Sequence, residues 1–494
     1  MTEHVAIRRL PSGVPGFDEI LGGGLPEFSF NVIAGGPGTG KTTLVQQIMF
    51  ALAGPDRRAL FFTVLGEPPI KMLRYQQQYT FFDAAKINDS IRFLNLADDI
   101  ARGTLDTIMA RIVREVAAAD PRLVVVDSFR SVVHAATNDR GGEVELQRFV
   151  QQLGVHLTGC EATTFLVGEY ARSDADENPI FTVADGVVWL HQSVDRNSVV
   201  RKMQVAKMRG QASMSGLHTF RITEDGIRAF PRIVGPNARE GSMPVGNAAR
   251  RRLSTGVKTL DEMLGGGIPA GYSVLLAGPS GSGKSVLASQ FIAEGARAGE
   301  PGVIAVFEKR PGEYAPSSAK GREFERMVLD GTVTILNTRP LDMSIDETLH
   351  DLTEAIRRTG ARRLVIDSLS GFELALAPTF REDFRESLYR MVSVLTGMGV
   401  TVVMTTELED SYTDLRFSPH GTAFLTDVIV LQRYVEMGGR IGRMMTVIKV
   451  RGSAHSTDLR SYDITADGVV VGETLSSFGG LLTGNPEPAN GKNA

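Results

Sequence analysis

Two glycine-rich stretches contain the residue types that a bound polyphosphate requires. They read, in order, Gly35, Gly36, Pro37, Gly38, Thr39, Gly40, Lys41 and Thr42, and Gly278, Pro279, Ser280, Gly281, Ser282, Gly283, Lys284 and Ser285. Both fit Gly-x-x-x-x-Gly-Lys-Ser/Thr, in which backbone N–H groups surround phosphate oxygens, the lysine supplies a cation and the hydroxyl ligates Mg²⁺. We therefore expect ATP and Mg²⁺ at both stretches, with Lys41 and Lys284 as catalytic cations and Thr43 and Val286 completing the sites.

A phosphate loop works only between a strand and a helix, and the flanking sequence predicts both. Apolar runs at residues 30–34 and 272–277 precede the loops and are typical of strands. After the loops, apolar side chains recur at one-turn spacing, as Leu44 and Ile48 and again as Leu287 and Phe291, which predicts helices. The phosphates would then lie at a helix N-terminus.

Asp127 and Asp367 are the candidate metal-binding carboxylates. Each ends an unbroken apolar run, which is typical of a strand buried on both faces of a parallel sheet. A carboxylate in that position can hold Mg²⁺ together with Thr42 or Ser285. The alternative is an ordinary strand-end turn residue, and the same element in both halves favours the metal role.

The candidates for activating the attacking water differ between the two halves. When the halves are superimposed by sequence, Glu308 falls opposite Leu65. Glu308 is therefore the expected base of the second half and a further candidate metal ligand. In the first half, Glu67 lies two residues beyond Leu65 and is either a base or a surface carboxylate.

A third repeated stretch offers fixed positive charge. It reads Lys207-Met208-Arg209-Gly210 in the first half and Lys449-Val450-Arg451-Gly452 in the second. Lysine and arginine two residues apart on a strand share one face, so both could approach one triphosphate. The arginine would stabilise charge that develops in the transition state.

The whole chain is an internal duplication. Residues 12–26 reappear as residues 255–269, and the phosphate loops, the Asp-ending runs and the Lys-x-Arg stretches follow in the same order. Alternating strands and helices predict an α/β fold with a mostly parallel central sheet flanked by helices in each copy. We expect domains at 1–232 and 251–480, a linker at 233–250 and a flexible tail at 481–494.

Composition narrows the class of protein. Lys plus Arg number 53 and Asp plus Glu number 57, so the chain lacks the overall basic character typical of nucleic-acid binding. One cysteine, Cys160, allows no internal disulfide and fits a reducing compartment. The N-terminal sequence has no signal-peptide core, and no apolar stretch is long enough to span a membrane. These features predict a cytoplasmic protein with no membrane or nucleic-acid partner.

Together, the Gly-Val-x-x-x-Asp-x-x-Leu-Gly-Gly-Gly opening, the phosphate loop, the Asp-Ser strand end and Lys-x-Arg-Gly resemble the KaiC family of ATPases and autokinases. The resemblance implies two tandem RecA-like P-loop ATPase domains in a homohexamer that acts as a signalling or timing switch, with an unidentified signalling protein as partner. It also implies that residues of one subunit reach the nucleotide of its neighbour. Those residues are Lys207 and Arg209 for the first site, and Lys449, Arg451, Ser453 and His455 for the second.

The chain departs from the family at two places. The family has two adjacent glutamates after the strand that follows each loop, whereas this chain has Glu308-Lys309 in one copy and Leu65-Gly66 in the other. The family's Ser-Thr phosphoacceptor pair falls on Ala423-Phe424. Thr422 and Thr426 flank that position and are the remaining candidate phosphoacceptors for serine/threonine autokinase activity.

Two other functions fit parts of the sequence. A RecA/RadA-like DNA-dependent ATPase would need a local basic groove and salt-sensitive binding. A nucleotide-gated scaffold that hardly hydrolyses ATP would fit the first copy, which lacks the aligned carboxylate. The DNA-dependent ATPase predicts that single-stranded DNA stimulates hydrolysis. Measuring hydrolysis separately at the two sites tests the scaffold.

Overall fold

The computed structural model describes residues 7–64, 69–102, 104–136, 142–175, 178–195, 198–232, 251–307, 319–337, 343–381, 384–408, 425–437, 439–476, 478–481 and 487–488. The chain divides into two compact units, Met1–Arg232 and Ile233–Ala494. The predicted linker at 233–250 and most of the predicted tail lie outside the described residues.

The first unit alternates strands and helices through most of its length. Its strands are β1 (Arg9–Leu10), β2 (Leu25–Pro26), β3 (Phe30–Gly35), β4 (Ala59–Thr63), β5 (Ile91–Asn95), β6 (Leu123–Asp127), β7 (Thr163–Glu169), β8 (Gly186–Asp195), β9 (Ser198–Met208), β10 (His218–Thr223) and β11 (Gly226–Phe230). Its α-helices are α1 (Phe17–Leu21), α2 (Lys41–Leu52), α3 (Pro69–Gln76), α4 (Ala97–Arg102), α5 (Leu105–Ala119), α6 (Phe129–Ala136), α7 (Gly142–Gly159) and α8 (Pro179–Val183). Short 3-10 helices, η1 and η2, span Ala84–Lys86 and Arg172–Ala175.

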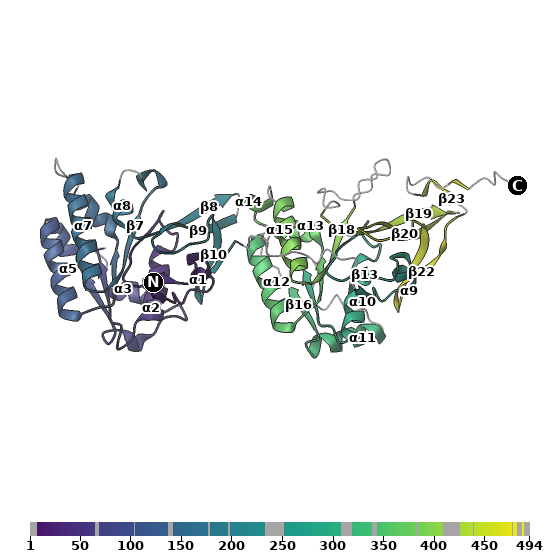
Figure 1. Cartoon of the computed structure of the whole chain (residues 1–494), viewed down its shortest axis with the longest axis horizontal. Helices are drawn as coiled ribbons and strands as arrows, with labels where there is room; N and C mark the ends of the chain where they lie inside the picture. The colour runs from purple at the N-terminus through teal and green to yellow at the C-terminus, as the bar shows by residue number, and fades with distance from the viewer. Residues whose placement is uncertain are drawn as a thin grey trace, which may run out of the picture. The chain divides into compact units, whose positions relative to one another are not determined.

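A nine-stranded sheet with the order β11-β10-β9-β8-β3-β7-β6-β4-β5 organises this unit. Strands β8, β3, β7, β6, β4 and β5 are parallel, and β9, β10 and β11 extend the sheet in antiparallel fashion. Every residue of β3 and β6 is buried, because apolar clusters cover both faces of the sheet. Helices α5 and α7 cover one face (Figure 1), and α2 packs on the other.

The second unit repeats this architecture. Its strands are β12 (Arg252–Leu253), β13 (Ile268–Pro269), β14 (Ser273–Gly278), β15 (Gly302–Val306), β16 (Val333–Asn337), β17 (Arg363–Asp367), β18 (Thr401–Glu407), β19 (Val428–Met437), β20 (Arg440–Val450), β21 (Arg460–Thr465), β22 (Gly468–Thr474), β23 (Phe478–Gly479) and β24 (Glu487–Pro488). Its helices are α9 (Lys258–Met263), α10 (Lys284–Arg297), α11 (Ala319–Leu329), α12 (Ile345–Thr359), α13 (Leu369–Ala375), α14 (Pro378–Arg381) and α15 (Phe384–Gly397).

The second nine-stranded sheet has the equivalent order, β16-β15-β17-β18-β14-β19-β20-β21-β22. Helices α12 and α15 lie together against one face (Figure 1), and α10 packs on the other. The predicted α/β fold with two tandem RecA-like domains is therefore confirmed. Among the described residues, no helix is both long enough and apolar enough to span a membrane.

Candidate functional site: two phosphate loops

The first phosphate loop connects β3 to α2, as its sequence predicts. Strand β3 ends at Gly35 and α2 begins at Lys41. Between them, Gly40 has a φ of 97°, in the region that favours glycine, and a Cβ on Gly40 would lie 2.7 Å from Cδ1 of Ile222. The loop therefore needs glycine at this position to turn into the helix.

The lysine of the loop folds back over it. Nζ of Lys41 donates a hydrogen bond to the carbonyl oxygen of Gly36 at 2.7 Å, and the hydroxyl of Thr39 donates to the same carbonyl at 2.9 Å. Burial lowers the pKa of Lys41, while the negative charges of Glu169 and Asp127 oppose that change. The ammonium group is thus held beside two carboxylates.

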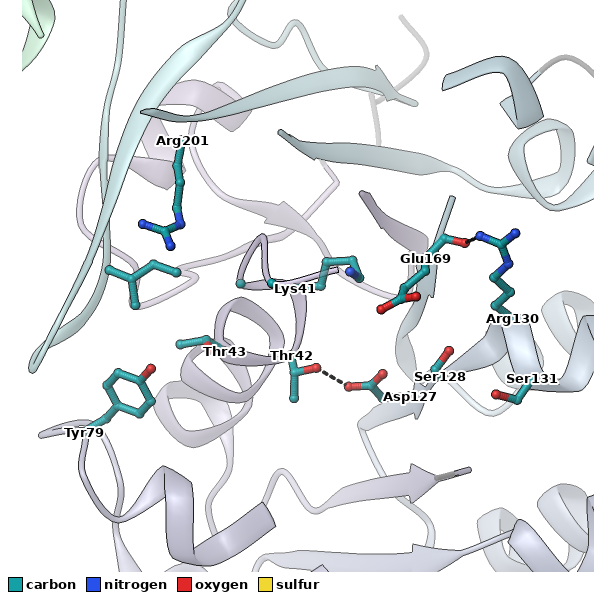
Figure 2. Close-up of a pocket in the computed structure, with 13 residues that line it drawn as sticks. Lys41, Thr42, Thr43, Tyr79, Asp127, Ser128, Arg130, Ser131, Glu169 and Arg201 are labelled. Atoms are coloured by element: carbon teal, nitrogen blue, oxygen red, sulfur yellow. Dashed lines mark hydrogen bonds between the residues drawn. The ribbon is translucent and has the colours of Figure 1, made fainter. Parts of the chain in front are cut away.

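The hydroxyl and carboxylate predicted to bind a metal lie together. Oγ1 of Thr42 donates to Oδ2 of Asp127 at 2.6 Å (Figure 2). Burial raises the pKa of Asp127 from 3.8 to about 6, although the Thr42 hydrogen bond and the charge of Lys41 act in the opposite direction. The hydroxyl and the carboxylate both offer oxygen ligands, which suit Mg²⁺. This metal also takes ligands from phosphates and water.

A cavity of about 960 Å³ opens over this loop. Its lining includes Lys41, Thr42 and Asp127, together with side chains that no sequence motif identified (Figure 2). These additional side chains are Tyr79, Arg130, Ser131, Glu169, Arg201 and Ile222, and Ser128 of the Asp-Ser strand end also lines the cavity. The glycine-rich loop, the cation, the hydroxyl and the carboxylate fit a Mg²⁺-bound nucleoside triphosphate in charge and in donor type.

The second loop repeats the backbone plan of the first, and its lysine folds back over it in the same way. Nζ of Lys284 donates to the carbonyl oxygens of Gly278 at 2.8 Å and Pro279 at 2.7 Å. The buried carboxylate of Asp367 accepts a hydrogen bond from the hydroxyl of Thr405 on β18. Tyr434, on β19, donates from its hydroxyl to the carbonyl oxygen of Ser280 at 3.1 Å. In both units the peptide bond that follows the aspartate, Asp127-Ser128 or Asp367-Ser368, is cis.

The Lys-x-Arg residues lie away from the phosphate loop of their own unit. Lys207 pairs with Val187 of β8, which lies beside Val32, whereas the loop begins at Gly35. Lys207 donates to the carbonyl oxygen of Thr182 at 2.9 Å, and Arg209 forms a 3.1 Å ion pair with Asp185. Burial lowers the pKa of Lys207.

The second unit repeats this arrangement. Lys449 donates to the carbonyl oxygen of Thr426 at 2.6 Å, and Arg451 forms a 3.1 Å ion pair with Asp427. Ser453 accepts a hydrogen bond from Arg252, and His455 is half-buried in the same loop. The aspartates that hold both arginines are residues that sequence reasoning did not assign to the sites.

Three predicted residues, Glu67, Glu308 and Thr422, lie outside the described residues. Thr426 is described, and its side chain is fully buried where the chain enters β19.

A phosphate loop separated from an aspartate-bearing strand by one inserted strand, β7 or β18, and present twice in one chain, defines a tandem RecA-like P-loop ATPase. The family model described as "ATPase: KaiC" matches residues 10–233 and again residues 253–476. The chain therefore belongs to the KaiC ATPase family.

The curated relatives cover nearly the whole chain. A protein named "Circadian clock oscillator protein KaiC" from Rippkaea orientalis is 28% identical over 97% of this chain and 92% of its own length. "Circadian clock oscillator protein KaiC 1" from Synechocystis is 28% identical with the same coverage. A protein from Prochlorococcus marinus strain MIT 9313, also named "Circadian clock oscillator protein KaiC", is 27% identical over 98% of this chain and 97% of its own length.

Proposed function

We propose that this KaiC-like ATPase binds one Mg²⁺·ATP at each phosphate loop, hydrolyses both, and uses turnover to switch the conformation of a homohexamer in signalling. The observation that carries the proposal is the repeated combination of lysine, hydroxyl and buried aspartate. It comprises Lys41, Thr42 and Asp127 in one unit and Lys284, Ser285 and Asp367 in the other.

Each of these side chains has one task in hydrolysis. The loop N–H groups and the lysine hold the β- and γ-phosphate oxygens, and the aspartate and hydroxyl hold Mg²⁺. When bound, Mg²⁺ would neutralise charge that develops on the phosphates. At the second site, Glu308 accepts the proton of the attacking water and so supplies general-base assistance.

The arrangement of the Lys-x-Arg residues supports action on a neighbouring subunit. Each arginine is held by an aspartate and each lysine by a backbone carbonyl, away from the phosphate loop of their own unit. This position supports contact with a nucleotide bound by another chain. An arginine of this kind stabilises transition-state charge without needing to change its protonation. We assign Arg209 and Arg451 this role, with Lys207, Lys449, Ser453 and His455 beside them.

Autophosphorylation on Thr422 or Thr426 is the finer part of the proposal. In that reaction a threonine hydroxyl replaces water as the nucleophile. Because the side chain of Thr426 is fully buried, transfer to this residue requires a movement that exposes its hydroxyl.

The test is incubation of the full chain with γ-labelled ATP, followed by separation of free phosphate from phosphoprotein and mapping of the label. We expect free phosphate from the native chain, less from Lys41→Ala and from Lys284→Ala, and none from the double variant. Label on Thr422 or Thr426 supports the autokinase reaction. Free phosphate no greater than that from the double variant contradicts hydrolysis altogether.

A further inference from the structure

The first phosphate loop has a carboxylate that the alignment of the two copies does not suggest. Where the second copy has Glu308, the first has Leu65, and both positions lie outside the described residues. Glu169, the last residue of β7, instead lines the first cavity together with Lys41, Thr42 and Asp127.

The sheet register places Glu169 between the phosphate loop and the metal-binding aspartate. Strand β7 lies between β3 and β6 in the sheet. Glu169 pairs with Gly35, the first residue of the loop, and Asp127 pairs with Val167 two positions earlier on the same strand. Because side chains two apart on a strand share a face, Glu169 projects on the same face as Val167, beyond the end of β6.

The pKa changes of Lys41 and Asp127 also indicate that Glu169 lies near both residues. Among the charges acting on Lys41, that of Glu169 raises its pKa most, ahead of Asp127. The charge of Glu169 also contributes to the raised pKa of Asp127. Its side chain points toward the space between Lys41 and Asp127 (Figure 2), where the terminal phosphate would lie.

Glu169 also meets two further requirements of a general base, which are access to solvent and a fixed position. Its side chain is exposed, so solvent reaches the carboxylate. Its backbone is fixed, because the guanidinium of Arg130 on α6 donates a hydrogen bond to its carbonyl oxygen (Figure 2). A general base must lie within hydrogen-bond reach of the water and hold a defined position.

We propose that Glu169 is the catalytic residue that orients and deprotonates the attacking water at the first site. The inference rests on the proposed hydrolysis of ATP there. The water oxygen forms a bond to the γ-phosphorus while its proton passes to the Glu169 carboxylate. The bond between the γ-phosphorus and the bridging oxygen breaks, and its electron pair leaves with ADP. Lys41 lies beside both the carboxylate and the departing charge.

The duplication retains a glutamate at the same register in the second unit. Glu407 ends β18 and pairs with Gly278, the first residue of the second loop. The second site therefore has Glu308 in addition to this carboxylate, whereas the first site relies on Glu169. The two sites would then activate water with carboxylates from different positions in the sequence.

The experiment uses the full chain with Lys284→Ala, so that only the first site turns over. Glu169→Gln and Glu169→Asp are compared in this background for phosphate release, and for the affinity of a fluorescent ATP analogue. We expect Glu169→Gln to lower kcat by ~10²-fold or more while nucleotide affinity changes far less, and Glu169→Asp to retain intermediate turnover. Glu145→Gln, on the exposed surface of α7, is the matched control and should leave turnover unchanged.

The outcomes separate this inference from the proposed function. Turnover that persists in Glu169→Gln overturns the role of Glu169 and leaves first-site hydrolysis standing. Equal losses of affinity and turnover also overturn it, because they assign Glu169 to ground-state binding. No first-site turnover in Lys284→Ala with Glu169 intact overturns both proposals.

Discussion

Asp127 is held in a protonation state that its surroundings disfavour. The side chain is 8% exposed, and burial raises its pKa from 3.8 to about 6. Because this pKa lies below 7, the folded protein keeps a buried negative charge at neutral pH, which is the form of the carboxylate that a metal would need. Groups that function requires often lower the stability of the folded state in this way.

The pH dependence follows from the direction of the pKa change. An acid with a higher pKa in the folded state binds its proton more tightly there than in the unfolded chain. The folded state therefore loses stability as the pH rises from 3.8, and the loss is complete above about 6. A pKa change of this size corresponds to ~3 kcal/mol at most.

Asp127→Asn removes the buried charge and keeps the shape of the side chain. We expect the nucleotide-free first unit to gain roughly 1–3 kcal/mol near pH 8 and much less near pH 4, measured by thermal unfolding at each pH. Mg²⁺-dependent nucleotide binding at the first site should be lost in the same variant.

The matched control is Asp56→Asn, in an exposed turn between α2 and β4, which should change stability by less than ~0.5 kcal/mol. A gain for Asp127→Asn that is as large at low pH as at high pH would show that the buried charge is not its cause.

Among the elements, the turn that follows α1 and its equivalent after α9 are stabilised by partly different side-chain hydrogen bonds. In the first unit, Nε2 of Gln211 donates to the carbonyl oxygens of Leu21 at 2.7 Å and Gly24 at 2.8 Å. In the second unit, the equivalent carbonyls of Leu264 and Gly267 accept from Nη1 of Arg252 at 2.9 and 2.8 Å. In the first unit Arg9 of β1, the equivalent of Arg252, also donates to this turn, at the carbonyl oxygen of Gly22 (2.5 Å). The turn thus depends on β1 and on the loop after the Lys-x-Arg stretch in the first copy, and on β12 in the second.

Arg252→Ala should destabilise the second unit by ~1–3 kcal/mol, because two carbonyls and the Ser453 hydroxyl lose their donor. Thermal unfolding of the full chain measures the change. Arg297→Ala is the control, since its ion pair with Glu323 is solvent-exposed and should contribute less than ~1 kcal/mol. Equal effects of the two substitutions would contradict the role of Arg252 in the turn.

The sequence predicts those elements whose residues are buried or carry a motif. Strands β3, β6, β14 and β17 appear as apolar runs because both faces of the sheet are covered. The loops are recognisable because their glycines, lysines and hydroxyls are required by phosphate chemistry.

The sequence does not predict the remaining site residues, because only the folded chain brings them to the cavity. The residue types favour a strand over residues 163–167, and Gly168 ends this pattern before Glu169, although β7 continues to Glu169. Tyr79 and Arg201 reach the cavity from a turn and from an antiparallel strand, without any motif of their own. The strand pairing that brings these segments together is long-range, and local residue patterns do not encode it.

In the whole molecule, the role proposed for Arg451 requires a second chain at the second site. Lys449 pairs with Ile429, which lies beside Leu275, so it is roughly 10 Å along the sheet from the start of the loop at Gly278. Arg451 continues away from the loop to its ion pair with Asp427. The proposed action across a subunit interface would let both residues meet a nucleotide bound by another chain.

Mixing two inactive variants tests this arrangement directly. Lys284→Ala chains and Arg451→Ala chains, both with Lys41→Ala to silence the first site, should each lack turnover. In a co-assembled 1:1 mixture, roughly a quarter of the interfaces would combine an intact Lys284 from one chain with an intact Arg451 from its neighbour. Phosphate release should therefore reappear on mixing.

Lys284→Ala mixed with Glu308→Gln is the matched control, because both residues belong to the chain that binds the nucleotide and no interface regains a complete site. A first mixture as inactive as this control, with co-assembly verified by affinity capture of one tagged variant, would place Arg451 outside the neighbour's site.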